Sequence, residues 1–201
     1  MKYLKRWNPD LIASVDAMRE ALTECYVYEG AYPSIDAFSV NAEIGERPGT
    51  LVATNGRMMI AVAVILEAKD VAGFVAPRVF VYARQNSKDD DNFIKVKLMR
   101  KYVTIQNGDI LPRSELPTDT NYPNVAQVIP KEDELKEGLR HFSPVFMAEL
   151  ASAMGYSQDG NNVFSCMAAD HMSPAICRIL QCEYSRQAVG VIMPQRYGAE
   201  G

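Results

Sequence analysis

Long apolar runs are absent from this sequence of 201 residues, and their absence argues against a membrane-spanning protein. A helix needs about 20 consecutive, mostly apolar residues to cross a bilayer, and no segment approaches that length. Residues 1–6 (MKYLKR) lead into no apolar segment of the kind that secretory signal peptides contain. We therefore expect a cytoplasmic protein with no membrane partner.

Cysteine is scarce as well, with four residues in the whole chain. A chain of this length can bury a hydrophobic core without a disulfide framework, and cytoplasmic thiols stay reduced. The spacing of the cysteines matches no disulfide-rich pattern. We therefore expect free thiols at Cys25, Cys166, Cys177 and Cys182, the last three mostly buried in strands.

Two other roles for these residues have little support in the sequence. One is a zinc site, whose ligands would be Cys166, His171, Cys177 and Cys182. Its spacing is poor, because no Cys-x2-Cys pair is present. The other is a cysteine nucleophile with His141 or His171 as its base, but no signature brings such a pair together. We expect no enzyme, no catalytic residue, no metal and no other cofactor.

Basic residues do not outnumber acidic ones. The chain has 21 Lys and Arg against 25 Asp and Glu, which gives a formal net charge of −4. A protein that grips the phosphates of DNA usually has a basic domain, so this balance argues against simple electrostatic DNA binding. It does not exclude a protein that surrounds DNA without gripping it. The hydrophobic content of 48% indicates a folded chain.

Apolar periodicity and capping residues predict two helices. Apolar side chains recur at helical spacing over residues 11–25. Ser143 and Pro144 open a second helix that Gly155 closes, because serine caps helices, proline suits the first turn and glycine follows the last. Residues 77–86 are ambiguous between a short helix and a buried strand.

The other apolar segments predict strands separated by turns. The Asn-Gly pairs at 55–56 and 107–108 are typical hairpin turns, residues 46–49 (ERPG) predict another turn, and 117–130 is a proline-marked connection. The predicted strands are 2–7, 37–43, 50–54, 58–66, 71–75, 93–99, 102–106, 110–116, 138–142, 161–169, 175–184 and 188–193.

One unit, a strand followed by a helix and three strands, recurs near residues 2–66, 71–116 and 138–193. Blocks of strands with isolated helices predict an α+β fold, with antiparallel sheets and helices that cover one face.

Three segments resemble a known family. Residues 51–59 (LVATNGRMM) are similar to the family segment VATDGHRLA, residues 122–131 (YPNVAQVIPK) to FPDYRRVLPK, and residues 189–196 (VGVIMPQR) to YVVMPMR. The family is the bacterial sliding clamp, the beta subunit of DNA polymerase III. The order of the segments and the terminal place of the third make the resemblance specific.

The resemblance implies a DNA-clamp fold of about one and a half clamp domains. Residues 1–121 resemble the second clamp domain, and residues 122–201 resemble part of the third. The resemblance implies that this sequence contains no counterpart of the first clamp domain.

In the family, partners dock a short peptide in an apolar cleft between the second and third domains. The resemblance places this cleft at Ile35, Thr54, Gly56, Arg57, Met58, Met59, Pro123, Val128, Val191, Met193 and Pro194. Methionines suit a groove that accepts several peptides, because their side chains are flexible and polarizable. The turn departs from the family's usual Asp-Gly-His, Gln127 replaces an arginine of the cleft rim, and Gln195 replaces a methionine.

The resemblance implies a DNA replication protein whose partners are peptides of a DNA polymerase or of a clamp loader. Duplex DNA would be a further partner of a homo-oligomeric ring that acts as a processivity factor. However, the helix that follows Ser143 carries Glu149 and no basic residue to face phosphates. The alternative is therefore an adaptor or decoy that binds replication proteins without encircling DNA.

Overall fold

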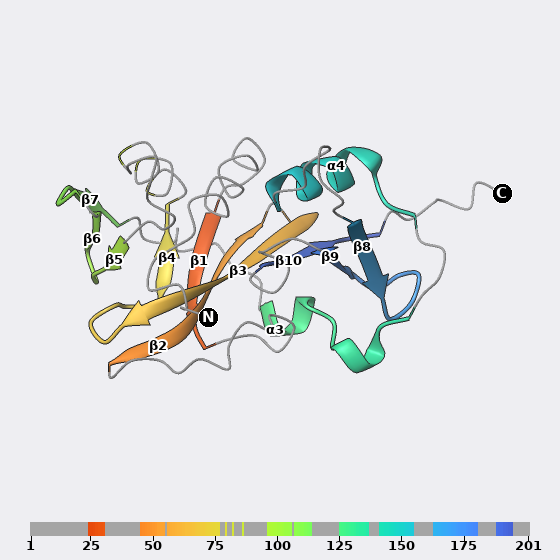
Figure 1. The fold of residues 1–201 in the computed structure, drawn as a ribbon, viewed down its shortest axis with the longest axis horizontal. Coiled ribbons are helices and arrows are strands. Elements are labelled where there is room, and N and C mark those ends of the chain that lie inside the picture. Colours follow the sequence, from red (N-terminus) through yellow and green to blue (C-terminus); the bar gives the residue numbers. More distant parts are fainter. Residues whose placement is uncertain are drawn as a thin grey trace.

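The chain forms a long antiparallel sheet and a small three-stranded sheet (Figure 1). The computed structural model describes residues 24–30, 45–54, 56–76, 79, 82, 86, 96–105, 107–113, 125–136, 141–154, 163–180 and 188–194. Within these ranges, no helix has the length and apolar character that a bilayer crossing requires.

The large sheet has seven strands in the order β4-β1-β2-β3-β10-β9-β8, and every neighbouring pair is antiparallel. β3 therefore pairs with β10, which comes from the far end of the described chain (Figure 1). The strands are β1 (Glu24–Glu29), β2 (Glu46–Thr54), β3 (Met58–Glu67), β4 (Gly73–Val75), β8 (Val163–Ala168), β9 (Ala175–Leu180) and β10 (Ala188–Ile192).

Both faces of the central strands β2, β3 and β10 are largely buried. Alternate residues of β3, among them Ile60 and Val62, join the main core, which the helix α4 (Pro144–Ala153) covers. The residues between them, such as Ala61, join a second apolar cluster with Ile129, which follows the short helix α3 (Val125–Val128). The prediction of antiparallel sheets with helical cover is confirmed, and α3 adds a shorter cover on the opposite face (Figure 1).

Helix α4 begins where the sequence predicts. Pro144 is its first residue, and the carbonyl of Ser143 accepts a hydrogen bond of 3.0 Å from the amide of Met147. The helix lies close to β10 because Gly190 has no side chain. A Cβ atom at that position would lie 2.6 Å from Sδ of Met154, a residue of the adjoining turn.

The predicted turn at residues 46–49 is wrong, because these residues begin β2. Pro48 is tolerated there because β1 has already ended at Glu29. The carbonyl of Pro48 accepts a 2.9 Å hydrogen bond from the amide of Gly30. Gly49 serves packing and not a turn. A Cβ atom on Gly49 would lie 2.8 Å from the side chain of Leu66.

The small sheet has the predicted turn and forms inside the strands predicted at 93–99, 102–106 and 110–116, although Met99 and Arg113 are irregular. Its order is β5-β6-β7, and Gly108 takes a left-handed φ of 93° between β6 and β7. Val96 and Leu98 are buried whereas Lys97 is exposed, as the alternation in the sequence predicts. The strands are β5 (Val96–Leu98), β6 (Tyr102–Ile105) and β7 (Ile110–Pro112).

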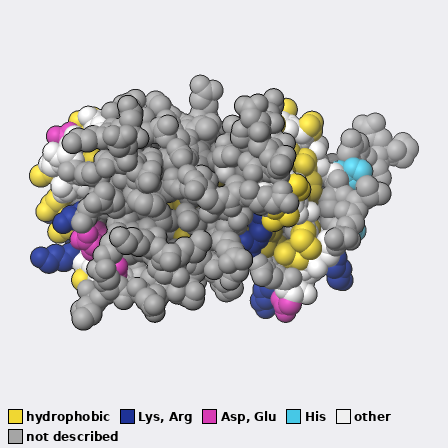
Figure 2. Space-filling view, viewed as in Figure 1, with side chains coloured by type: hydrophobic (Ala, Val, Ile, Leu, Met, Phe, Trp, Pro, Cys, Tyr) yellow, Lys and Arg dark blue, Asp and Glu magenta, His cyan; other side chains and the backbone are white. Residues whose placement is uncertain are grey.

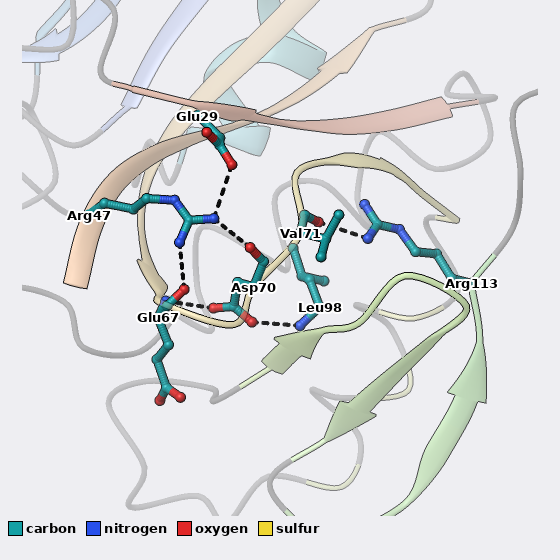
Figure 3. A network of polar contacts seen from close by, with 7 residues as sticks. All are labelled: Glu29, Arg47, Glu67, Asp70, Val71, Leu98 and Arg113. Atoms are coloured by element: carbon teal, nitrogen blue, oxygen red, sulfur yellow. Dashed lines mark hydrogen bonds and ion pairs between the residues drawn. The ribbon is translucent and has the colours of Figure 1, made fainter. Parts of the chain in front are cut away.

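Asp70 and Arg113 join the two sheets (Figure 3). The carboxylate of Asp70 accepts hydrogen bonds from the amides of Glu67 in β3 (2.7 Å) and Leu98 in β5 (2.8 Å). The side chain of Arg113 donates to the carbonyls of Val71 and Phe74, each at 2.7 Å. These bonds satisfy backbone groups where regular pairing stops.

Several other predicted elements differ from the structure or lie partly outside the described residues. Glu24 and Cys25 lie in β1 and not in a helix, and the rest of the helix predicted at 11–25 lies outside the described residues. The strand predicted at 138–142 is wrong at its last two residues, which are irregular. Lys136 forms an isolated bridge to Ala168 of β8 instead.

Of the ambiguous segment at 77–86, Val79 and Tyr82 are helical. The connection at 117–130 contains α3. The strands predicted at 2–7 and 37–43 lie outside the described residues.

Candidate peptide-binding cleft

The candidate cleft lies where β3 begins and β10 ends. Val191 is opposite Met59 in the antiparallel register, and Ile192 is opposite Met58. The amide of Met193 extends this pairing by donating a 2.9 Å hydrogen bond to the carbonyl of Arg57. Residues far apart in the sequence are thereby held side by side by backbone bonds.

The turn between β2 and β3 forms one wall. The hydroxyl of Thr54 donates a 2.9 Å hydrogen bond to the carbonyl of Met58 and accepts one of 3.1 Å from the amide of Gly56. Gly56 has a φ of +81°, a left-handed conformation that glycine adopts at low cost. No atom of the other described residues lies within 4 Å of where its Cβ would be, so they leave the space beside this backbone open.

A cavity of about 190 Å³ lies against this wall. Pockets for drug-sized ligands are about 300–1,000 Å³, so this one fits one or two side chains of a partner. Among the described residues that line it, Arg57 is the only charged one. These residues are Thr54, Gly56, Arg57, Met58, Met59, Val128, Val191 and Met193.

The floor and the rim of the cavity differ in exposure. Met58 and Met59 are 2% and 3% exposed, and Val191 is 1% exposed. Met193 at the rim is 41% exposed. The floor is therefore fixed by the core, whereas the rim side chain is free to change rotamer when a partner arrives.

Arg57 links the rim to α4. Its guanidinium lies 5.5 Å from the centre of the Phe146 ring, within the range of a cation–π interaction. This contact holds a positive charge beside an apolar cavity. No sequence pattern predicts this contact of Phe146, because it joins a hairpin turn to a helix distant in the chain.

Eight of the residues that the resemblance assigns to the cleft line this cavity. Pro194 is described and half-buried but does not line it, and Ile35 and Pro123 lie outside the described residues. The structure brings the eight together, and their role in binding a peptide stays a prediction.

The described part of the chain offers little support for a metal site or for a nucleophilic cysteine. It holds no group of three or more His, Cys, Asp or Glu side chains around a metal-sized position. Cys166 and Cys177 face each other, His171 is exposed in the turn between their strands, and Cys182 lies outside the described residues. Burial raises the pKa of the Cys25 thiol, which disfavours the thiolate that a nucleophile needs.

No protein-family profile and no curated protein matches this sequence. Solved structures do match. The sliding clamp (DNA polymerase III subunit beta) from Bartonella birtlesii, bound to griselimycin, has a TM-score of 0.59 and 14% identity, over 94% of this chain and 63% of that one. The DNA polymerase III beta subunit from Thermotoga maritima has a TM-score of 0.58 and 11% identity, over 94% and 63%.

The DNA polymerase sliding clamp from Caulobacter crescentus has a TM-score of 0.53 and 14% identity, over 98% of this chain and 68% of that chain. The chain thus spans about two thirds of the length of these clamps. The prediction of a partial clamp is confirmed at the level of the fold. The chain has the fold of the bacterial DNA polymerase sliding clamps.

Proposed function

We propose that this protein is a clamp-like DNA replication protein that binds peptides of its partners in the cavity between β3 and β10. One observation carries the proposal. Segments that resemble clamp motifs, far apart in the sequence, meet at a single apolar cavity. The partners would be a DNA polymerase or a clamp loader, in the cytoplasm, and the protein itself would catalyse no reaction.

The shape of the cavity supports a peptide as the occupant. Its volume suits the apolar side chains at one end of a short segment, and the neighbouring backbone at Gly56 is open to approach. Arg57 places a positive charge at the rim of this otherwise uncharged set of lining residues. An acidic residue beside the apolar end of the peptide would complement that charge.

The domain division remains part of the proposal. Residues 1–121 would form the unit similar to the second clamp domain, and 122–201 the unit similar to part of the third. The cavity would then lie where the two units meet, since β3 belongs to one and β10 to the other.

Self-association is proposed on a separate surface. β8 is one of the two edge strands of the large sheet and carries an isolated bridge to Lys136 at Ala168, whereas Val163 at its start and Leu180 opposite it are exposed. Figure 2 shows apolar side chains gathered where α4 and β8 lie. Val145 of α4 is one of the exposed apolar residues there. An edge with apolar neighbours favours pairing with another copy.

An adaptor that does not encircle DNA is the second candidate. Its support is the charge of α4, which contains Glu149 and no lysine or arginine. A clamp that surrounds a duplex presents cations toward the phosphates. Retention on closed circular DNA, measured at working concentration, separates the two candidates: a clamp stays on the circle and an adaptor does not.

Met193→Ala tests the cleft. A synthetic clamp-binding peptide with an apolar C-terminal end should bind the wild type in a fluorescence titration. We expect a Kd of about 1 μM, which corresponds to a binding free energy of roughly 8 kcal/mol. Met193→Ala should weaken binding about fivefold to tenfold, because a partly exposed rim anchor is lost. Met58→Ala is less informative, since Met58 is 2% exposed and its truncation would disturb the core.

Met172→Ala is the matched control. Met172 is 45% exposed and lies in the turn between β8 and β9, away from the cavity lining. Its truncation should leave the affinity unchanged. Absence of binding to the wild type, or equal losses in the two variants, would contradict a peptide site at this cavity.

A further inference from the structure

Two cysteines face each other across neighbouring strands at the edge of the large sheet. Cys166 of β8 and Cys177 of β9 are direct partners in the antiparallel register. Their Sγ atoms lie 2.7 Å apart. The two thiols are therefore in contact in the folded protein.

The backbone already has the spacing that a disulfide needs. Directly opposed residues of antiparallel strands have Cα atoms about 4.5–5.5 Å apart. Disulfides join Cα atoms about 4.4–6.8 Å apart. A bond between Cys166 and Cys177 therefore requires no movement of β8 relative to β9.

The two thiols differ in access and in ionisation. Cys166 is half-buried on the edge strand, whereas Cys177 is fully buried. The hydrogen bond between them lowers the pKa of the Cys166 thiol, an effect that its burial opposes. The same bond and burial raise the pKa of the Cys177 thiol. Cys166 is thus the thiolate that meets a reagent first, and Cys177 is the thiol placed to react second.

We propose that Cys166 and Cys177 form a thiol–disulfide exchange site, which small-molecule disulfides of the glutathione class oxidise to a cross-strand disulfide. The Cys166 thiolate attacks one sulfur of the reagent, forms a mixed disulfide and releases the first thiolate. Cys177 then loses its proton, attacks Sγ of Cys166 and expels the second thiolate. Two protons and two electrons pass from the protein to the reagent, which becomes two thiols.

The bond would close the hairpin that supports the cleft. Between the two strands, the carboxylate of Asp170 accepts hydrogen bonds from the amides of Met172 (2.7 Å) and Ser173 (2.8 Å), so the turn is already ordered. On the other side, β9 pairs with β10, and Ile176 is opposite the cleft residue Val191. Oxidation therefore fastens the edge strand to the sheet without entering the cavity.

Cys25 provides an internal comparison. It is buried in β1, and its partners in the register are Ala53 and Val75. It therefore has no cysteine opposite it. Oxidation at Cys166 and Cys177 would leave the Cys25 thiol unchanged.

The test is oxidation of the full-length reduced protein with oxidised glutathione, followed by intact mass spectrometry and peptide mapping without reduction. We expect a monomer that has lost two hydrogen atoms, with residues 166 and 177 in one linked peptide pair. Cys166→Ser and Cys177→Ser should each abolish the loss, whereas Cys25→Ala and Cys182→Ser should keep it. The oxidised wild type should melt roughly 6–12 °C above the reduced protein, because the unfolded chain is constrained.

Three results would overturn the proposal: no loss of hydrogen after prolonged oxidation, a linked pair other than 166–177, or a stable glutathione adduct on Cys166 that Cys177 does not displace. Mass spectrometry and peptide mapping of the oxidised wild type are sufficient for this test, so misfolding of a serine variant does not affect its result. Peptide affinity is a separate readout. Formation of the disulfide is independent of whether the cleft binds a peptide.

Discussion

At its first residue, Met58, strand β3 forms part of an apolar cavity, whereas at its last, Glu67, it enters a network of hydrogen bonds around a buried carboxylate. At the Glu67 end, Arg47 donates to the carbonyls of Glu67 (2.7 Å) and Asp70 and to the carboxylate of Glu29 (3.0 Å) (Figure 3). Polar groups there pair within the protein. At the Met58 end, apolar side chains and one cation line an open space.

The Glu67 end of β3 therefore stabilises the fold, whereas the Met58 end is suited to binding a partner. The carboxylate of Asp70 is bonded to two backbone amides of different sheets, so removing it leaves amides without acceptors. At the rim, the apolar side chain of Met193 is 41% exposed. Changes at the Glu67 end should therefore affect folding, and changes at the Met58 end should affect affinity for a partner.

Asp70→Ala should have the largest effect. It leaves the buried amide of Leu98 and the amide of Glu67 without their acceptor, at a cost of about 3 kcal/mol in the free energy of unfolding. Urea denaturation measures this loss. Asp133→Ala, at an exposed acidic residue, should change stability by less than about 0.5 kcal/mol.

The folded fraction of Asp70→Ala should keep the wild-type affinity for the peptide. If the alanine variant does not fold, Asp70→Asn retains one carbonyl acceptor and should show a smaller loss. A marked fall in peptide affinity without a fall in stability would contradict the assignment of stability to the Glu67 end of β3 and of peptide binding to the Met58 end.

Arg57→Gln should have a smaller effect, on binding. It removes the only cation among the described lining residues and should weaken the binding of a peptide that carries an acidic residue about twofold to fivefold, the scale of an exposed ion pair. The loss should shrink at high salt, and an amidated peptide without the acid should show little of it. Arg100→Gln, at an exposed arginine near β6, is the control.

The pH dependence of Asp70 is the smallest expected effect. Burial, as the largest cause, raises the pKa of this carboxyl, against the lowering by its bonds to the amides of Leu98 and Glu67. The folded protein therefore binds this proton more tightly than the unfolded chain, and the contribution of Asp70 to stability grows as pH falls.

Acid titration with urea denaturation measures this effect. The stability difference between the wild type and Asp70→Asn should rise as pH falls through the folded pKa and level off below the unfolded value of about 3.9. A difference that falls with acidification would mean that the amide bonds outweigh burial at this carboxyl.

Local sequence signals predicted the local structure well. Asn-Gly at 107–108 gives the β6–β7 turn, Ser143 and Pro144 begin α4, and the strands at 50–54 and 58–66 form the β2–β3 hairpin. These features depend on φ preferences and capping within a few residues, so the sequence carries them directly.

The remaining features depend on contacts that no local pattern encodes. The local pattern predicts a turn at Gly49, but a glycine is required there because Leu66 packs against β2. Neither the contact of Arg57 with Phe146 nor the bond from Leu98 to Asp70 has a signal in the sequence. The cleft residues came from the resemblance to clamps, because periodicity alone does not place β10 beside β3.

The pairing of Met59 with Val191 has a consequence for how the site arises during folding. One wall of the cavity comes from a local hairpin, and the other arrives only after a long loop has closed, which delays contacts of this kind. The site is therefore absent from any chain in which β10 has not yet joined β3. A peptide that fills the cavity selects molecules that have finished folding, and at 100 times its Kd it stabilises them by about 2.7 kcal/mol.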